Sequence, residues 1–128
     1  MIRLLAIDLD GTLFNSQQQI SPADRRAIDT ARSAGITPLV VTGRGRRGVE
    51  MGLDRIGLDL PHICSAGALI RQQRDAQALS SRTFQRMDEF RHVLDFVREH
   101  DLGLVADAPE THLWFGPDTL FENLDPLT

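Results

Sequence analysis

The amino-terminal apolar run constrains the fold of this chain more than any other segment. Residues 2–7 are apolar except for Arg3, and the run ends at Asp8. A short and nearly continuous apolar run is typical of a strand that is buried on both faces, as in a parallel sheet. Gly11 breaks the run, and the polar stretch 15–19 predicts a loop. We therefore expect the chain to begin with an inner strand of an α/β sheet.

The following segments repeat strand and helix signals with short turns between them. Ser21 and Pro22 predict a helix start, with Ser as the cap and Pro at the first helical position, and Gly35 predicts its end. A second strand, a second helix and a third strand are expected at residues 36–41, 46–56 and 61–64. This order predicts a doubly wound parallel, Rossmann-like sheet. Pro38 is expected to be tolerated because it lies near its strand's start.

The pattern changes after about residue 71. Arg74-Asp75 predicts a hairpin turn between two short strands, and Asp88 is expected to cap a helix that runs to about His100. Two more strands are expected at residues 103–106 and 112–115. We therefore expect residues 1–79 to belong to the parallel sheet and residues 80–128 to begin a smaller α/β unit.

Composition excludes several classes of protein. The chain has 128 residues with a formal net charge of -4, and its 14 cationic residues are all arginine. The acidic balance argues against nucleic-acid binding, and no apolar run approaches the ~20 residues that span a membrane. The single cysteine forms no internal disulfide, which predicts a cytoplasmic protein. Without lysine, the chain holds no complete Walker-type phosphate loop and performs no Schiff-base chemistry.

Two polar turns follow the first two predicted strands. Asp8 and Asp10 come after the first strand, and Thr42 and Gly43 come after the second. Ligands of open α/β sheets bind beyond the carboxyl ends of the strands, so we expect these turns to meet at one site. One carboxylate there can bind a cation such as Mg²⁺, while the other remains free for proton transfer. A hydroxyl followed by a glycine amide at a helix start predicts a phosphate cradle.

Three segments resemble the haloacid dehalogenase superfamily of phosphohydrolases, in particular its Cof-type, IIB-like branch. The segment from Asp8 to Leu13 is similar to the first motif, residues 41–44 to the second, and residues 64–70 to the segment that leads into the cap domain. The resemblance covers essentially the whole chain. Ala66 departs from it, because the family usually has Asn-Gly-Ala at this place.

The resemblance implies a Mg²⁺-dependent phosphatase that acts on a small phosphorylated metabolite such as a sugar phosphate. Asp8 would be the nucleophile that forms an aspartyl-phosphate, and Asp10 would act as general acid and base. The Asp8 carboxylate and the Asp10 main-chain carbonyl would hold Mg²⁺. The Leu9 amide, the Thr42 hydroxyl and the Gly43 amide would hold the phosphoryl oxygens.

Two further motifs of the family are absent from the sequence, namely a phosphate-facing lysine and a Gly-Asp-Gly-x-Asn-Asp-like stretch that adds an acidic metal ligand. We therefore expect an amino-terminal portion of the enzyme, with residues 1–79 as part of the core and residues 80–128 as the start of the cap. Such a portion is expected to be inactive alone, and its unpaired strand edges would allow self-association or binding of a partner chain. The alternative is a short form that binds phosphate or a phosphometabolite without turnover. A signalling phosphoacceptor domain fits less well, since it too needs a lysine.

The other reactive side chains have simpler interpretations. Arg44, Arg46 and Arg47 are predicted to form a solvated helix face rather than substrate clamps. Cys64 is predicted to be a small core residue. The four histidines show no spacing typical of metal ligands and are interpreted as surface or packing residues. Trp114 and Phe115 are interpreted as packing residues of the second unit.

Overall fold

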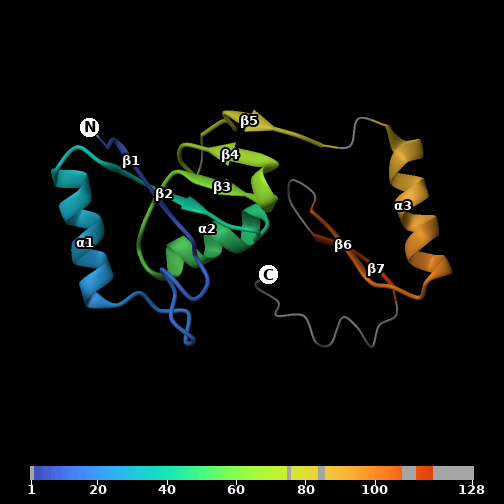
Figure 1. Ribbon diagram of the computed structural model, residues 1–128, viewed down its shortest axis with the longest axis horizontal. Coiled ribbons are helices and arrows are strands. Elements are labelled where there is room, and N and C mark those ends of the chain that lie inside the picture. The colour runs from blue at the N-terminus through green and yellow to red at the C-terminus, as the bar shows by residue number, and fades with distance from the viewer. Residues whose placement is uncertain (1, 75, 84–85, 108–111, 117–128) are drawn as a thin grey trace. The chain divides into compact units, whose positions relative to one another are not determined.

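The computed structural model describes residues 2–74, 76–83, 86–107 and 112–116 (Figure 1). The described residues fall into two compact units that divide between Ser81 and Arg82, and each unit is described separately. Within the described ranges, each helix is too short or too polar to cross a membrane.

The first unit is built on a five-stranded sheet in the order β1-β2-β3-β4-β5. β1 pairs with β2 and β2 with β3 in parallel, whereas β3–β4 and β4–β5 are antiparallel. The strands are β1 (Leu4–Ile7), β2 (Thr37–Val41), β3 (His62–Cys64), β4 (Leu69–Arg71) and β5 (Ser80–Ser81). The α/β class is confirmed, and the antiparallel hairpin lies at the end of the sheet remote from β1.

Two helices connect the parallel strands. α1 (Pro22–Ser33) begins where the sequence predicts, and the Ser21 hydroxyl accepts a 3.0 Å hydrogen bond from the Asp24 amide. α2 (Arg46–Arg55) follows β2. Since both crossovers step in the same direction along the sheet, right-handed connections place both helices on one face. The core cluster includes Ile28 of α1 and Val49 of α2.

Pro38 lies inside β2 without a lost hydrogen bond. Alternate residues of β2 donate to opposite neighbours, with the Thr37 amide bonded to Arg3 of the β1 side and the Val40 amide bonded to Pro61 of the β3 side. An amide at position 38 would therefore face the β3 side. Because β3 begins only at His62, opposite Val40, no strand lies there to receive it. The expected tolerance of this proline is confirmed.

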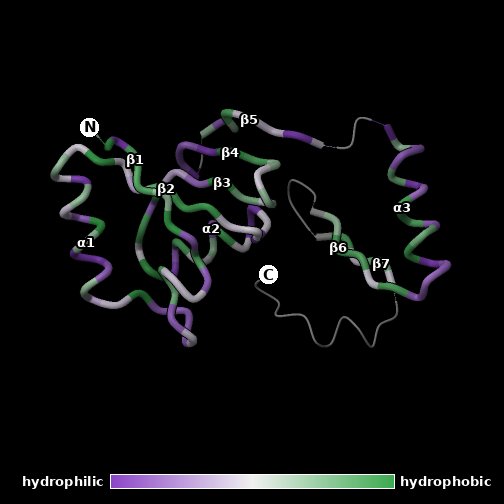
Figure 2. Tube along the Cα trace, in the orientation of Figure 1, coloured by the Kyte–Doolittle hydropathy of each residue, from purple (hydrophilic) through white to green (hydrophobic). Residues whose placement is uncertain are grey.

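The expected burial of β1 on both faces is wrong for this structure. Leu4 is 62% exposed and Leu5 is 42% exposed. Neighbouring residues of a strand point to opposite faces, so both faces are uncovered at this strand. In the described part of the chain no element covers the side chains of Leu4 and Leu5, and β1 is terminal in the sheet, so a neighbouring strand shields them on one side only. Figure 2 shows β1 as a hydrophobic strand.

The second unit packs a helix against a hairpin. α3 (Met87–Glu99) is followed by β6 (Leu104–Asp107) and β7 (His112–Phe115), which pair antiparallel. Polar and apolar residues alternate along α3 (Figure 2), and Phe90 meets Phe115 edge to face with ring centroids 5.9 Å apart. Asp88 lies in the first turn rather than at the cap, and its hydrogen bond with the Arg86 side chain lowers the pKa of the Asp88 carboxyl. The packing role predicted for Phe115 is confirmed.

Candidate functional site

The turn after β1 is anchored in the core by its apolar residues. The Leu13 amide donates to the Asp8 carbonyl at 3.2 Å, and the Phe14 amide donates to the Leu9 carbonyl at 2.7 Å. Leu9, Leu13 and Phe14 are buried, whereas Asp8 and Asp10 are exposed. The turn therefore holds its two carboxylates on the surface at the carboxyl end of a strand.

The turn after β2 begins as an extension of the sheet. The Thr42 amide donates to the Ile63 carbonyl at 3.0 Å, and the buried Thr42 hydroxyl accepts a 3.2 Å hydrogen bond from the Arg44 amide. Gly43 is exposed, and a Cβ added there would have no heavy atom within 4 Å. The backbone at Gly43 is therefore open to a ligand.

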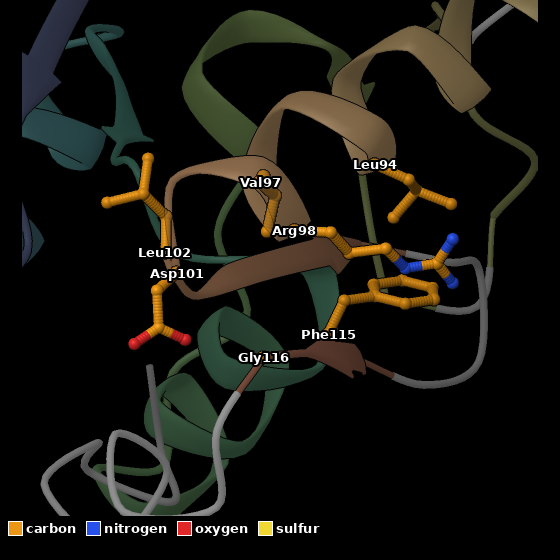
Figure 3. Close-up of a pocket in the computed structure, with 7 residues that line it drawn as sticks. All are labelled: Leu94, Val97, Arg98, Asp101, Leu102, Phe115 and Gly116. Carbon is orange, nitrogen blue, oxygen red and sulfur yellow. The ribbon is translucent and has the colours of Figure 1, made fainter.

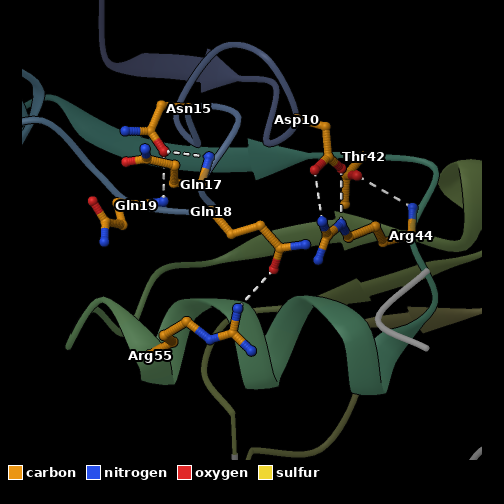
Figure 4. Close-up of polar contacts among 8 residues, drawn as sticks. All are labelled: Asp10, Asn15, Gln17, Gln18, Gln19, Thr42, Arg44 and Arg55. Atoms are coloured by element: carbon orange, nitrogen blue, oxygen red, sulfur yellow. Dashed lines mark hydrogen bonds and ion pairs between the residues drawn. The ribbon is translucent and has the colours of Figure 1, made fainter. Parts of the chain in front are cut away.

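The two turns meet through one ion pair (Figure 4). Arg44 Nε donates to Asp10 Oδ2 at 2.8 Å, and Arg44 Nη2 donates to Asp10 Oδ1 at 2.6 Å. Figure 4 shows the Asp10 carboxylate facing this guanidinium, with Thr42 beside them. The structure thus brings together Asp10 and the Thr42–Arg44 turn from segments 34 positions apart. Asp8 lies on the same turn as Asp10. Among the described residues, no hydrogen bond or ion pair joins the Asp8 side chain to Thr42 or Arg44.

The predicted solvated helix face is wrong for Arg44. Its side chain is 6% exposed, and it lies before Gly45, the residue that caps α2. Helical spacing therefore does not apply to Arg44. Arg46 pairs with Glu50 at 3.0 Å on α2, and Arg47 is exposed. The position of Arg44 just before the helix start is the signal that could have distinguished its environment from those of Arg46 and Arg47.

A third segment reaches the site through the backbone. The Ser65 amide donates to the Arg44 carbonyl at 2.7 Å. Ser65, Ala66 and Gly67 all have positive φ, at 50°, 51° and 95°. Ala66 stands where Asn is usual in the resembled family, and Asn tolerates this conformation better than Ala does. Nothing in the composition of the segment predicted that two non-glycine residues, Ser65 and Ala66, would adopt a positive φ.

Other predicted residues lie in the core or away from this site. Cys64 is fully buried in the core cluster, as expected. His62 is buried, with Nδ1 3.0 Å from the Leu60 carbonyl oxygen, so its packing role is confirmed. His92 and His100 are exposed, and the side chain of His112 lies outside the described residues.

The second unit contains a pocket of about 310 Å³ between α3 and the end of β7 (Figure 3). Its lining is mainly apolar, with Arg98 and Asp101 as its charged members. None of the predicted site residues lines this pocket. The candidate site is therefore the pair of turns in the first unit.

Most of the chain is similar in sequence to known proteins. A family model described as haloacid dehalogenase-like hydrolase matches residues 5–118. The 5-amino-6-(5-phospho-D-ribitylamino)uracil phosphatase YwtE of Bacillus subtilis is 36% identical over 96 residues, which are 75% of this chain and 32% of that protein. The pyridoxal phosphate phosphatase YbhA of Escherichia coli is 35% identical over 68 residues, which are 53% of this chain and 25% of that protein.

Solved structures agree with the fold. A haloacid dehalogenase-like hydrolase from B. subtilis superposes with a TM-score of 0.75 at 25% identity, covering 94% of this chain and 42% of that chain. The chain thus spans a third or less of the length of these curated relatives, and less than half of this solved structure.

Proposed function

Because the chain belongs to the haloacid dehalogenase-like hydrolase family, we propose that it supplies the nucleophile and the phosphate-binding turn of a Mg²⁺-dependent phosphatase. The observation that carries this proposal is the contact between the turns after β1 and β2, made by Arg44 and Asp10. It gathers carboxylates, a hydroxyl and an open glycine backbone at the carboxyl ends of adjacent parallel strands. That edge is where open α/β sheets bind ligands.

The proposed substrate is a small phosphorylated metabolite such as a sugar phosphate. The two curated relatives carry the names of phosphatases for 5-amino-6-(5-phospho-D-ribitylamino)uracil and for pyridoxal phosphate. Both are small phosphate monoesters, which supports this class for the present chain. A cytoplasmic location, expected from the single cysteine, stays a prediction.

In the proposed reaction, an Asp8 carboxylate oxygen bonds to phosphorus while the bond from phosphorus to the ester oxygen breaks. Asp10 gives its proton to that ester oxygen, so the alcohol leaves neutral. A water molecule then bonds to phosphorus, Asp10 takes the proton of this water, and the bond between Asp8 and phosphorus breaks to release phosphate. The Leu9 amide, Thr42 hydroxyl and Gly43 amide would hold the phosphoryl oxygens during both steps.

The donor chemistry of the first turn fits Mg²⁺. The Asp8 carboxylate and the Asp10 main-chain carbonyl are hard oxygen donors on one exposed turn, and Mg²⁺ is commonly bound by one or two carboxylates with water and substrate phosphate. Bound there, the ion would neutralise phosphoryl charge. Within the described ranges, no group of three or more His, Cys, Asp or Glu residues could hold a metal. The chain would therefore supply only part of the coordination.

Turnover and metal binding test these roles separately. We expect hydrolysis of p-nitrophenyl phosphate in Mg²⁺ to stay near background, because a missing phosphate-facing cation and a missing metal ligand each cost several kcal/mol at the transition state. Near-normal turnover by the 128-residue chain would contradict an incomplete site.

For the metal, Mn²⁺ should broaden the NMR amide signals around Asp8, Asp10 and Gly43. Asp8→Asn should remove this broadening, whereas Asp29→Asn, which alters an exposed carboxylate of α1, should retain it. Broadening centred elsewhere, or none at millimolar Mn²⁺, would contradict the assignment.

The second candidate function is a form that binds phosphate or a phosphometabolite without turnover and pairs with another polypeptide. The exposed β1 edge favours it, because unpaired apolar strands recruit further strands. Sedimentation should detect concentration-dependent association, which Leu4→Lys weakens and Leu79→Lys, at a 67% exposed leucine elsewhere, does not. A monomer at all concentrations would contradict self-association through β1.

A further inference from the structure

The guanidinium of Arg44 is buried, but the carboxylate that it binds is not. The Arg44 side chain is 6% exposed, while the Asp10 side chain is 53% exposed. Two parallel hydrogen bonds of 2.8 and 2.6 Å join them. The Asp10 carboxylate is therefore held along one edge from inside the protein and remains accessible on the other.

The rest of Arg44 is fixed by its neighbours. The guanidinium carbon lies 5.7 Å from the centre of the Phe14 ring, and Nη1 is buried without a hydrogen-bond partner. A Cβ added at Gly52 would lie 2.9 Å from Phe14 Cε2, so the absence of a side chain at Gly52 makes room for the Phe14 ring over which the Arg44 guanidinium lies. The Arg44 backbone is bonded to Thr42 Oγ1 and to the Ser65 amide. Both the side chain and the main chain of Arg44 are thus constrained.

A second buried arginine shows what a purely structural role looks like. Arg71 is 9% exposed, and it lies 3.4 Å from the Glu50 carboxylate, which is also largely buried. Arg71 Nη2 also donates to the Arg74 and Ala76 carbonyls, which fixes the loop between β4 and β5. Arg44 has no comparable carbonyl partners in its described contacts, and its side-chain hydrogen bonds go to Asp10.

We propose that Arg44 is a positioning residue that fixes the plane of the Asp10 carboxylate against the Thr42–Arg44 turn. This inference rests on the acid–base role proposed for Asp10. A planar guanidinium binds both carboxylate oxygens at once and so restricts rotation about the Asp10 side-chain bonds, whereas an ammonium binds as a point charge and does not. The free edge of the carboxylate is then presented in one orientation. Arginine, and not lysine, is therefore required at position 44.

NMR of the 128-residue chain tests this without reference to turnover. Three-bond couplings to the Asp10 carboxyl carbon should report one dominant χ1 rotamer in the unaltered chain. Arg44→Lys and Arg44→Met should both give averaged couplings, with the methionine variant averaged most. Arg71→Met is the matched control, since it removes a buried paired guanidinium elsewhere and should leave the Asp10 couplings unchanged.

A reciprocal measurement covers the case in which an Arg44 variant does not fold. Asp10→Asn keeps the shape of the side chain but removes its charge, and it should accelerate exchange of the Arg44 Nε proton about tenfold or more, the factor equivalent to a charged hydrogen bond. A single Asp10 rotamer in Arg44→Met, equal averaging in Arg71→Met, or unchanged exchange in Asp10→Asn would each overturn the proposal. Because none of these measurements involves hydrolysis, an inactive chain would leave their result intact.

Discussion

The backbone conformation of Ala66 is strained and lowers the free energy of unfolding. Replacing this residue should raise the free energy of unfolding again by part of that amount. Its φ and ψ are 51° and 35°, in the left-handed region. This conformation costs an ordinary L-residue roughly 1–2 kcal/mol, whereas glycine and, to a lesser extent, asparagine adopt it readily. Ala66 is exposed, so its methyl group contributes little packing to weigh against this strain.

The expected gain follows from two opposing terms. Ala66→Gly removes the strain of about 1–2 kcal/mol but adds about 0.4–1 kcal/mol of unfolded-state entropy. The free energy of unfolding should therefore rise by about 0.5–1 kcal/mol. Ala66→Asn should give a gain of similar size, since Asn keeps a side chain that restricts the unfolded chain. For a unit of about 80 residues, 1 kcal/mol corresponds to roughly 4–8 °C in Tm.

The matched control makes the same chemical change in a different conformation. Ala27 is exposed in the interior of α1, where Ala27→Gly should lower the free energy of unfolding by about 0.5–1 kcal/mol. Urea unfolding followed by far-UV circular dichroism measures both variants, and amide hydrogen exchange in β2 assigns the change to the first unit. A loss of stability in Ala66→Gly equal to that in Ala27→Gly would refute the reasoning.

Three further substitutions test packing and capping. Gly52→Ala places a Cβ 2.9 Å from Phe14 and should cost about 1–3 kcal/mol in urea unfolding, so unchanged stability would contradict this packing. Gly103→Ala places a Cβ against the Trp114 ring and should lower the urea midpoint reported by fluorescence of this single tryptophan, which an unshifted midpoint would contradict. Ser21→Ala removes the α1 cap and should cost about 1 kcal/mol in the same urea assay, whereas no loss would show that the cap hydrogen bond is unimportant.

Local signals predicted the elements of the first unit well because they act over a few residues. Ser21 and Pro22 gave the start of α1, and Gly35, with a φ of 74°, lies just past its end. The burial of β1 could not be predicted in the same way. An apolar run records what a strand tends to bury, but its exposure depends on which elements lie beside it, and β1 has no described neighbour on its outer edge.

The candidate site was predicted only in part, because some of its features follow from local sequence signals and others depend on contacts between distant segments. The positions of Asp8, Asp10 and Thr42 at the ends of successive strands follow from the alternation of strands and helices, and their roles stay a prediction. The Arg44–Asp10 contact joins residues 34 positions apart, and neither residue carries a local signal of it. The cluster with Arg46 and Arg47 placed Arg44 on a solvated helix face, although Arg44 lies two residues before the start of α2.

The charge balance at the two turns predicts a different response to inorganic phosphate for each of the two proposed functions. A bound phosphate would bring about 1.5–2 negative charges next to the Asp8 and Asp10 carboxyl groups, and the Arg44 guanidinium is already paired with Asp10. The chain contains no lysine to offset the remainder. We therefore predict that inorganic phosphate raises the Tm measured by calorimetry only when Mg²⁺ is present. Asp8→Asn, which removes one negative charge, should make the shift less dependent on Mg²⁺. An equal shift of the unaltered chain without Mg²⁺ would contradict this balance and favour the form that binds without turnover.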